Sequence, residues 1–341
     1  MTAPLRLTVD TAALAANWRW FAQRGGAAGC GAAVKADGYS LGAGVALRTL
    51  AAAGCREFFV ATWAEAEVLL PLPGGVRLAV LHGLLPGEAA LASVVPVLNS
   101  PAQVARWRAA GGGACDVMVD TGMNRLGLSR DEIASGLLDG LEVDVLHSHL
   151  ACADEPDNAM NAAQLARFRE VRAVVPHRRA SLANSAGICL GDAYHFDLTR
   201  PGIGLYGGVS HPAAAGRLAP VALLDARVVL VREVAAGETY GYGATWTAPR
   251  ASRLAILNIG YADGYRRAFS SVGRAYAGDY PCPVVGRVSM DLTAVDVTGV
   301  AVGEGDWLRL DFDLAAASAV SGVSQYELLT GLGRRYTRAL C

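Results

Sequence analysis

Short apolar runs alternate with longer amphipathic stretches over roughly the first 210 residues of the chain. The runs predict buried strands, and the stretches between them predict helices. Because strands and helices alternate regularly, the pattern indicates βαβ units and a parallel sheet. About eight units fit, which favours an N-terminal (β/α)8 barrel of the TIM type. We expect strands at residues 31–34, 58–61, 78–81, 94–98, 117–120, 143–147 and 179–183, and helices at 64–70, 102–110 and 161–175.

The pattern changes after residues 211–216. Beyond them, apolar runs are joined by turns rich in glycine and proline, and few helices are expected before residue 325. This is typical of a separate, mostly-β domain. We expect the domain boundary between residues 215 and 220, which gives a barrel domain at 1–217 and a β domain at 218–341. The expected strands of the second domain are residues 222–234, 254–259, 283–288, 293–297 and 307–310.

Composition narrows the class of protein. Hydrophobic residues make up 52% of the chain, but no apolar stretch approaches the roughly 20 residues of a membrane span, so we expect a soluble protein without a membrane partner. The first residues lack a basic segment followed by an apolar one, and a cytoplasmic protein is therefore expected. A net charge of −1 argues against nucleic acid as a partner. Seven scattered cysteines argue against a disulfide framework or a structural zinc site.

Lys35 is the only lysine of the chain, because the other twenty-nine of its thirty basic residues are arginine. Arginine cannot lose its proton in a protein, whereas a lysine amine can be deprotonated and can form a Schiff base with a carbonyl group. Most lysines are simply exposed, and that alternative stands beside the covalent one. Lys35, however, follows the strand at 31–34. It is therefore expected at the carboxyl end of a parallel strand, where such folds bind ligands.

His147 and His149 alternate along another expected strand, so both face one side of it. They could be metal ligands of a barrel hydrolase, with Asp263 or Asp291 completing the site. The alternative is a histidine that is packed and hydrogen-bonded at the end of a strand, since two ligands are too few for a metal site. No metal site is expected.

A phosphate site is indicated at the same edge of the barrel. Residues 202–207 fit the pattern Gly-x-Gly-x-x-Gly, which we interpret as a cradle of backbone amides for a single phosphate. Ser185 adds a hydroxyl group. Arg125, in the glycine-flanked loop at 120–127, could bind a carboxylate, although a surface arginine fits the spacing equally well. A phosphate cradle combined with a reactive lysine is what pyridoxal 5′-phosphate requires.

Eight segments match, in order, the motifs of one known enzyme family: residues 33–39, 120–127, 149–155, 183–186, 200–203, 241–246, 260–264 and 286–291. Through them the chain resembles the alanine racemases of fold-type III, which are pyridoxal phosphate enzymes, over essentially its whole length. This resemblance implies that it interconverts L-alanine and D-alanine and supplies D-alanine for cell-wall peptidoglycan. A racemase of serine or of a broader set of small amino acids is the nearest alternative. A non-catalytic carrier of the cofactor is disfavoured, because such proteins resemble the barrel alone.

The resemblance also implies roles for single residues. Racemisation needs two acid/base groups on opposite faces of the substrate's α-carbon, and these are Lys35 for the D-enantiomer and Tyr242 for the L-enantiomer. Arg200 is expected to face the pyridine nitrogen of the cofactor. The other expected cofactor-binding residues are Tyr39, His149, Ser185, Gly202, Ile203 and Tyr326, and the expected substrate-binding residues are Arg125, Met290 and Tyr261, with Tyr261 and Tyr326 narrowing the entrance.

In this family, Tyr242 and Met290 reach the active site of a second subunit, which implies a homodimer with shared active sites. One position departs from the usual pattern. Met118 stands where many members carry a carbamylated lysine. Our hypothesis is that Arg125 is steadied instead by another group or by an anion such as chloride.

Overall fold

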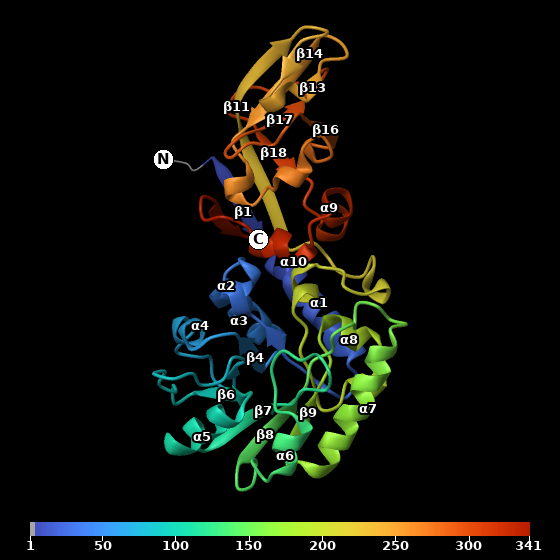
Figure 1. The fold of residues 1–341 in the computed structure, drawn as a ribbon. Coiled ribbons are helices and arrows are strands. Elements are labelled where there is room, and N and C mark those ends of the chain that lie inside the picture. Colours follow the sequence, from blue (N-terminus) through green and yellow to red (C-terminus); the bar gives the residue numbers. More distant parts are fainter. Residues whose placement is uncertain (1–3) are drawn as a thin grey trace. The chain divides into compact units, whose positions relative to one another are not determined.

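A computed structural model describes residues 4–341 of the chain (Figure 1). These residues form two compact units. One unit is Leu14–Ala219, and the other combines the residues up to Ala13 with Pro220–Cys341. Every strand and helix expected from the sequence is present, with its ends shifted by up to three residues.

The unit Leu14–Ala219 is built on parallel strands that neighbour one another in the order of the chain. This order is what repeated βαβ connections produce. The seven strands of the sheet are β3 (Ala32–Ala33), β4 (Glu57–Val60), β5 (Arg77–Val80), β6 (Val94–Leu98), β7 (Ala114–Met118), β8 (Glu142–His147) and β9 (Arg179–Ser181).

Two short strands close this sheet into a barrel. β2 (Gly29–Cys30) runs into β3 and pairs in parallel with β10 (Leu198–Thr199). On the other side of β10, the amides of Asp197 and Arg200 donate hydrogen bonds to the carbonyls of Ala180 and Ala183. The segment of β10 therefore lies between β9 and β2. With β2 and β3 counted as one strand, eight strands form a ring, which confirms the TIM-type barrel.

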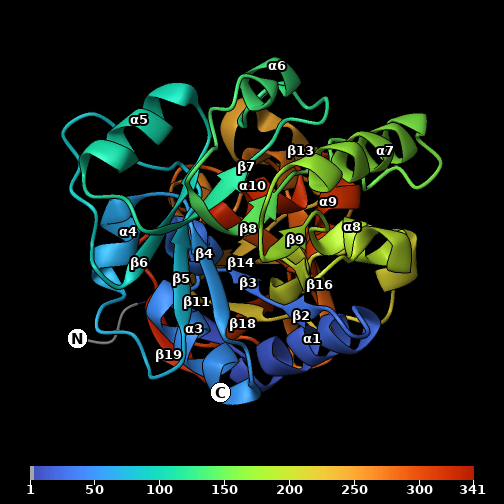
Figure 2. The ribbon, with the colours of Figure 1, turned by 90° about the horizontal axis from the view of Figure 1, so that it is seen from below.

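Helices surround the strands of this unit (Figure 2). Side chains before several of them act as N-caps: Thr62 forms a capping box with Glu65, and the side chains of Ser100 and Asn158 accept amide hydrogens of α5 and α7. The helices are α1 (Thr11–Arg24), α2 (Lys35–Tyr39), α3 (Ala43–Ala53), α4 (Trp63–Val68), α5 (Pro101–Ala109), α6 (Arg130–Ala134), α7 (Ala159–Val174) and α8 (Ser185–Cys189), with 3-10 turns η1 (Asp192–Tyr194), η2 (Ile203–Tyr206) and η3 (Pro212–Ala214).

The second unit contains an eight-stranded, mostly antiparallel sheet in the order β14-β17-β16-β15-β18-β11-β1-β19. Its longest strand, β11 (Ala222–Val234), pairs with β1, β14 and β18. The other elements are β1 (Leu5–Val9), β12 (Thr239–Tyr240), β13 (Trp246–Thr247), β14 (Ser252–Leu257), β15 (Arg274–Ala277), β16 (Tyr280–Val285), β17 (Thr293–Asp296), β18 (Trp307–Leu310), β19 (Thr337–Leu340), α9 (Leu314–Ser321), α10 (Gln325–Thr330), η4 (Tyr242–Ala244), η5 (Tyr261–Asp263) and η6 (Arg267–Phe269).

The start of the chain corrects one expectation. Residues 1–217 were expected in the barrel domain, but β1 belongs to the β unit, where it pairs antiparallel with β11 and parallel with β19. The reason lies in its alternation. Leu5, Leu7 and Val9 are buried, and Arg6 between them is exposed. That period of two suits a sheet with one buried face, whereas barrel strands are buried on both faces.

The barrel interior contains an apolar layer. Buried side chains from six strands meet in it, and Met118 is one of them. The position that in many relatives is expected to hold a carbamylated lysine is thus filled by an apolar side chain among apolar neighbours. The members of the layer are Phe59, Ala79, Val97, Met118, Val145 and Leu198, with Leu81 packed against them.

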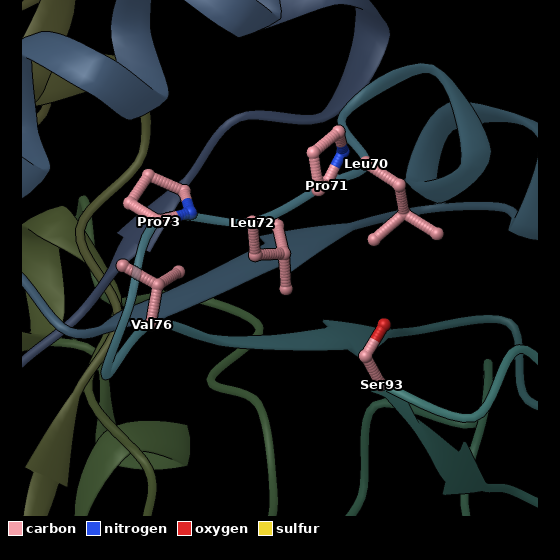
Figure 3. A pocket seen from close by; sticks show the side chains of 6 residues that line it. All are labelled: Leu70, Pro71, Leu72, Pro73, Val76 and Ser93. Atoms are coloured by element: carbon pink, nitrogen blue, oxygen red, sulfur yellow. The ribbon is translucent and has the colours of Figure 1, made fainter.

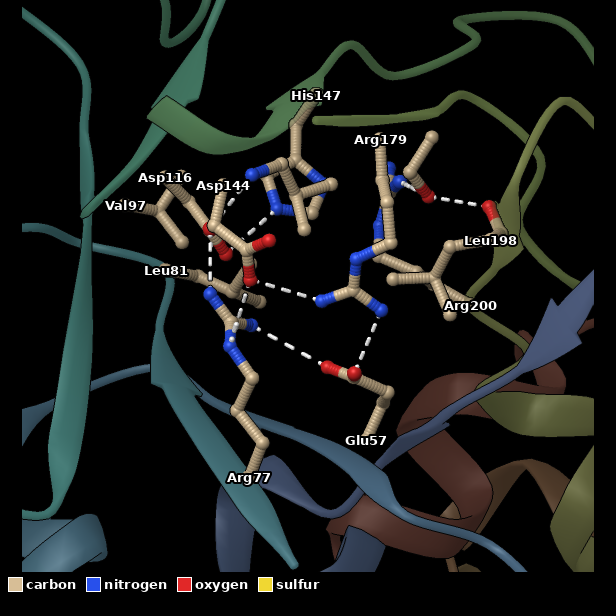
Figure 4. Close-up of polar contacts among 12 residues, drawn as sticks. Glu57, Arg77, Leu81, Val97, Asp116, Asp144, His147, Arg179, Leu198 and Arg200 are labelled. Carbon is tan, nitrogen blue, oxygen red and sulfur yellow. Dashed lines mark hydrogen bonds and ion pairs between the residues drawn. The ribbon is translucent and has the colours of Figure 1, made fainter. Parts of the chain in front are cut away.

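An ionic layer lies toward the amino-terminal ends of the strands (Figure 4). Arg77, at the start of β5, binds Glu57, Asp116 and Asp144 at N···O distances of 3.3, 2.5 and 3.2 Å. Arg179, at the start of β9, binds Glu57 at 2.7 Å and Asp144 at 2.8 Å. These five side chains come from β4, β5, β7, β8 and β9. We call them the barrel floor.

A surface pocket of about 590 Å³ lies at this same amino-terminal edge. Val76 immediately precedes β5 and Ser93 immediately precedes β6, so the pocket opens at the end of the barrel opposite to that of Lys35 (Figure 3). Its mostly apolar lining offers no group for acid/base chemistry. The lining residues are Leu70, Pro71, Leu72, Pro73, Val76 and Ser93.

Candidate active site

Lys35 is separated from the end of β3 only by Val34 and is the first residue of α2. The backbone after it is unusual: Ala36, Asp37, Gly38, Tyr39 and Ser40 all have positive φ angles, between 52° and 66°. Residues other than glycine rarely adopt this conformation, so it persists only where the surroundings hold it.

Two carboxylates hold this segment. The amide of Ala36 donates to Glu65 at 2.8 Å, and the amide of Ala43 donates to Asp37 at 2.9 Å. Glu65 also accepts the amide of Ala61 at 2.6 Å, at the end of β4. The segment that follows Lys35 is therefore tied to the neighbouring strand and to α3.

The surroundings of Lys35 favour a neutral amine. Burial is the main factor that lowers its pKa, and the positive charges of Arg125 and Arg200 lower it further, against the opposing charge of Glu65. A lysine must lose its proton before it can act as a nucleophile or a base. Lys35 is thus placed at the carboxyl end of a barrel strand, as expected, in an environment suited to that chemistry.

A tightly packed turn lies beside Lys35 on the barrel. The hydroxyl of Ser185 accepts the amides of Gly202 and Gly204 at 2.8 and 3.2 Å. A side chain at Gly202 would collide with the hydroxyl of Tyr39, and one at Gly204 would collide with Phe21. The structure therefore brings together Tyr39, Ser185 and the turn of Gly202 and Ile203, four of the expected cofactor residues, and the two glycines are needed because their neighbours approach the backbone so closely.

Arg200 is buried beside the same turn. Its guanidinium donates a hydrogen bond to the hydroxyl of Ser181 and another, of 2.6 Å, to the carbonyl of Ser148. Burial lowers the pKa of Arg200 to about 10, although the negative charge of Asp116 opposes this. Arg200 still carries its charge at neutral pH.

The two histidines meet different neighbours. Burial lowers the pKa of His149 to about 3, helped by the charges of Arg200, Arg125 and Lys35, so His149 is neutral at pH 7. His147 is buried and forms a 3.0 Å hydrogen bond from Nε2 to Asp116, and burial lowers its pKa to about 4. His147 is therefore joined to the barrel floor through Asp116. His149, in contrast, lies near the cations around Lys35.

Arg125 lies in a firmly folded loop. Both oxygens of the Asp120 carboxylate are engaged there: it accepts the amides of Gly122 at 2.8 Å, Met123 at 2.9 Å and Asn124 at 3.0 Å. Arg125 itself is exposed and, within residues 4–341, makes neither an ion pair nor a hydrogen bond. Its charge nevertheless acts on Lys35 and His149. A cation held on a rigid loop in this way is available to an anionic ligand.

The remaining expected site residues belong to the β unit. Tyr242 lies in η4 with 72% of its surface exposed, Met290 is 53% exposed, and Tyr261 and Tyr326 are also exposed. Tyr261 and Met290 are neighbours, because the amide of Tyr261 donates to Ser289 and that of Ala262 donates to Met290, both at 3.0 Å. All four are large side chains that the β unit leaves exposed.

The metal-dependent alternative finds no support in the geometry. Among residues 4–341, no three His, Cys, Asp or Glu side chains gather in a way that could hold a metal ion. Asp263 and Asp291, which could have completed such a site, both bind Arg335 instead. No helix in the described part of the chain is long and apolar enough to cross a membrane.

Comparison with known proteins decides the family. Residues 9–210 match the family model for the alanine racemase N-terminal domain, and residues 221–340 match that for the C-terminal domain. The chain belongs to the alanine racemase family. Both the fold and the order of the site segments agree with this membership, and the resemblance seen in the sequence is confirmed.

Individual members of the family are similar over nearly the whole chain. An alanine racemase of Acidiphilium cryptum is 46% identical over 98% of both chains. A biosynthetic alanine racemase of Agrobacterium fabrum is 44% identical, covering 98% of this chain and 93% of that protein. A crystal structure of alanine racemase from Bartonella henselae with covalently bound pyridoxal phosphate is 35% identical, covers 99% of this chain and all of that one, and superposes with a TM-score of 0.92.

The residues of this alanine racemase family member suit pyridoxal phosphate. Any side chain at Gly202 or Gly204 would fill the space at this turn. Three cations, Lys35, Arg125 and Arg200, outnumber the one carboxylate that acts on Lys35, which is Glu65. An excess of positive charge around a tight amide-rich turn matches a phosphate and a carboxylate. The donor set therefore fits the cofactor that the family uses.

Sequence reasoning missed four residues that organise the site. Glu65 ties the segment after Lys35, and the capping pattern from Thr62 to Glu65 could have pointed to it. Ser181 and Asp116 lie behind Arg200, and a charged residue inside an otherwise apolar strand was the available signal for Asp116. Arg335 left no signal in the sequence, because its partners are distant along the chain.

Proposed function

We propose that this protein is a pyridoxal phosphate-dependent alanine racemase that interconverts L-alanine and D-alanine. The observation that carries the proposal is the position of Lys35: the only lysine of the chain lies at the carboxyl end of a barrel strand, with its pKa lowered, beside a turn that suits a phosphate. Relatives across nearly the full length carry the same name. The product would serve as the D-alanine supply for cell-wall peptidoglycan.

In this proposal, Tyr39, Ser185, Gly202, Ile203 and Tyr326 hold the phosphate of the cofactor, and His149 packs against its ring. The neutral state of His149 supports packing of this kind, because a neutral imidazole adds no further charge among the cations. Bound pyridoxal phosphate would make the α-hydrogen of an amino acid acidic by withdrawing electrons from the α-carbon.

Arg200 limits the reaction to racemisation. The buried cation of Arg200 would oppose the protonation of the pyridine nitrogen of the bound cofactor. The cofactor would then withdraw electrons less strongly, which would disfavour side reactions. The hydrogen bonds of Arg200 to Ser181 and Ser148 keep the guanidinium in place.

Lys35 and Tyr242 are the two acid/base groups of the proposal. For D-alanine, the amine Nζ of Lys35 takes the α-proton from one face, and the hydroxyl of Tyr242 donates a proton to the opposite face. For L-alanine the roles are exchanged: the deprotonated hydroxyl oxygen of Tyr242 takes the α-proton, and Lys35 donates a proton to its own face. Arg125 and the Met290 amide bind the substrate carboxylate. Tyr261 and Tyr326 narrow the entrance, which favours a methyl side chain.

The proposed active unit is a homodimer with shared active sites, in which Tyr242 and Met290 serve the partner's site. Support comes from four large side chains of the β unit that are exposed within one chain: Tyr242, Met290, Tyr261 and Tyr326. Exposed aromatic residues and methionine are common at the centres of protein interfaces. The domain assignment follows from this: the barrel holds the cofactor, and the β domain completes the partner's site.

The first test is the colour and the chemistry of the purified protein. A yellow protein whose colour is bleached by borohydride, with the label confined to one peptide containing Lys35, is the expected result. The holoenzyme should convert L-alanine into D-alanine and the reverse. A colourless, zinc-loaded protein without racemase activity would overturn the proposal.

A panel of L-amino acids tests the substrate. We expect alanine to have the highest kcat/KM, with serine the nearest rival, because a narrow entrance discriminates by only about 10 to 200-fold for each added group. Higher turnover of serine would reassign the enzyme to the alternative. The biological direction needs a separate test, since a relative named catabolic, at 43% identity, is about as similar as the biosynthetic one.

A further inference from the structure

Three segments of the β unit carry Tyr261, Met290 and Tyr326, and they are far apart in the sequence. The first is the turn at residues 260–264, the second is the loop at 289–291, and the third is residues 325–336, which begin with α10. One side chain joins them. Arg335, in the third segment, binds Asp263 of the first and Asp291 of the second.

The geometry of this junction is tight. Arg335 donates to both carboxylate oxygens of Asp263, from Nε at 2.6 Å and from the neighbouring guanidinium nitrogen at 2.8 Å. Its third nitrogen donates to Asp291 at 2.7 Å. A bidentate arginine–carboxylate pair fixes orientation as well as distance, which a single ammonium group cannot do.

Asp263 is the centre of the junction. Its side chain is 1% exposed and also accepts the amide of Gly260 at 3.0 Å. Its backbone carbonyl accepts the amide of Gly333 and the hydroxyl of Tyr336, both at 3.0 Å. A buried carboxylate is stable only when it is paired in this way. The turn of Tyr261 is therefore bound to the third segment from both its side chain and its backbone.

The first two segments are also in backbone contact. Any side chain at Gly260 would collide with the carbonyl oxygens of Ser289 and Met290, and two amides of the turn donate to those same carbonyls. Arg335, by binding Asp291, completes this contact at the end of the loop that carries Met290. The backbone of Met290 cannot shift without the turn of Tyr261.

We propose that Arg335 is a positioning residue that sets the substrate specificity of the enzyme, because it fixes the relative positions of Tyr261 and Met290. This inference rests on the proposed function, in which the Met290 amide binds the substrate carboxylate and Tyr261 narrows the entrance. Arg335 itself touches neither substrate nor cofactor. It acts through Asp263 and Asp291.

The β unit contains a matched control. Arg309 on β18 binds Asp225 on β11 through Nε at 2.6 Å and through a second nitrogen at 3.2 Å, and its side chain is 48% exposed against 49% for Arg335. Its partner is likewise nearly buried. Arg309, however, joins two paired strands and carries none of the three segments. The variants Arg335→Lys and Arg309→Lys therefore remove equivalent bidentate pairs.

Two measurements on the holoenzyme separate positioning from stability. In Arg335→Lys, amide hydrogen exchange at residues 258–265 and 287–293 should quicken about tenfold, and the ratio of kcat/KM for L-alanine to that for L-serine should fall about tenfold, mainly through a higher KM for alanine. In Arg309→Lys, both should stay within about twofold of the wild type. Equal changes in the two variants, or none in either, would overturn the inference.

A milder variant covers the case in which Arg335→Lys does not fold. Asp291→Asn removes only the half-exposed arm of the junction and should reproduce the specificity change at about threefold; an unchanged ratio contradicts the inference. Failure of the proposed function would look different. The wild type would then racemise no amino acid, while hydrogen exchange would still report whether Arg335 holds the two segments.

Discussion

The two ends of the barrel treat charge in opposite ways. On the barrel floor, Arg77 and Arg179 are each bound to two or more carboxylates, and every charge has a partner within 3.3 Å. Around Lys35, at the other end, Arg125 and Arg200 add positive charge with only Glu65 and the more distant Asp116 opposing it. Removing one partner on the floor would leave buried charges uncompensated, whereas the unpaired cations around Lys35 can bind an anion. Substitutions at the two ends should therefore damage different properties.

The largest effect is expected from Lys35→Arg. The substitution keeps the positive charge but removes the amine that can lose its proton. We expect racemase activity to fall by about 10⁴-fold in both directions, since a covalent role cannot be replaced, while the thermal midpoint stays near that of the wild type. Retention of a tenth of the activity would show that only the charge of Lys35 matters.

The matching change on the floor is Arg77→Met. It leaves the buried Asp116 without its arginine partner, while Glu57 and Asp144 keep Arg179. Removing one partner of a buried ion pair costs about 3–5 kcal/mol, measurable by urea denaturation, and kcat per folded molecule should stay within about twofold.

The control for this change is Arg130→Met, because Arg130 and Glu170 form an exposed pair at 3.1 Å. Such pairs contribute about 0–1 kcal/mol. Equal losses of stability in Arg77→Met and Arg130→Met would show that the buried ion pairs of the floor contribute no more than an exposed pair.

Acid should weaken the barrel through its two buried histidines, His147 beside the floor and His149 near Lys35. The folded chain keeps His147 neutral down to a pKa of about 4, while the unfolded chain binds a proton near pH 6.5. Because the unfolded state then binds more protons, stability falls as the pH falls from 6.5 to 4, by about 3 kcal/mol at 1.36 kcal/mol for each pH unit. His149, whose pKa is lowered in the same direction, adds to the loss.

Urea denaturation of the wild type and of His147→Gln between pH 6.5 and 4 measures how much of the loss of stability is due to His147. The glutamine amide does not titrate, so the variant should lose less stability between pH 6.5 and 4, whatever its stability at pH 7. Parallel curves for the two proteins would mean that the contribution of His147 is negligible.

The smallest effect is expected from Arg125→Gln. Because the side chain is exposed and makes no ion pair among residues 4–341, stability should change by less than about 0.5 kcal/mol. The KM for alanine should rise about thirtyfold, in line with about 2 kcal/mol for a hydrogen bond to a charged group.

Chloride extends this test. If an anion steadies Arg125, varying chloride at fixed ionic strength should alter the KM of the wild type and leave Arg125→Gln unchanged. No response in the wild type would eliminate the anion hypothesis.

The sequence predicted most of the barrel, because buried strands and helices produce hydrophobic patterns within short stretches of the chain. It also predicted the region around Lys35, since a lone lysine after a strand and glycines at a tight turn are local features. It did not reveal contacts made across the barrel or between distant loops. Arg179 reaches Glu57 over 122 positions, and Arg335 reaches Asp263 over 72. A surface arginine and a structural arginine have the same sequence signature until the fold brings their partners together.

The first strand shows the same limit. Leu5, Leu7 and Val9 alternate with less buried residues, as in a strand with one buried face, but the sheet that includes this strand is formed by residues more than two hundred positions later. Strand identity is a local property, whereas strand pairing depends on the whole chain. The expected extent of the barrel domain was wrong at its start for this reason.

Lys35 has a practical consequence for anyone who handles this enzyme. Amine-coupling reagents, which attach most enzymes harmlessly to resins or dyes through scattered surface lysines, find only the chain's amino terminus and Lys35 to react with. If the α-amino group is blocked first, while bound cofactor protects Lys35, the remaining coupling reports on a single position. The amount of dye bound would then measure the fraction of protein molecules whose Lys35 is not occupied by the cofactor.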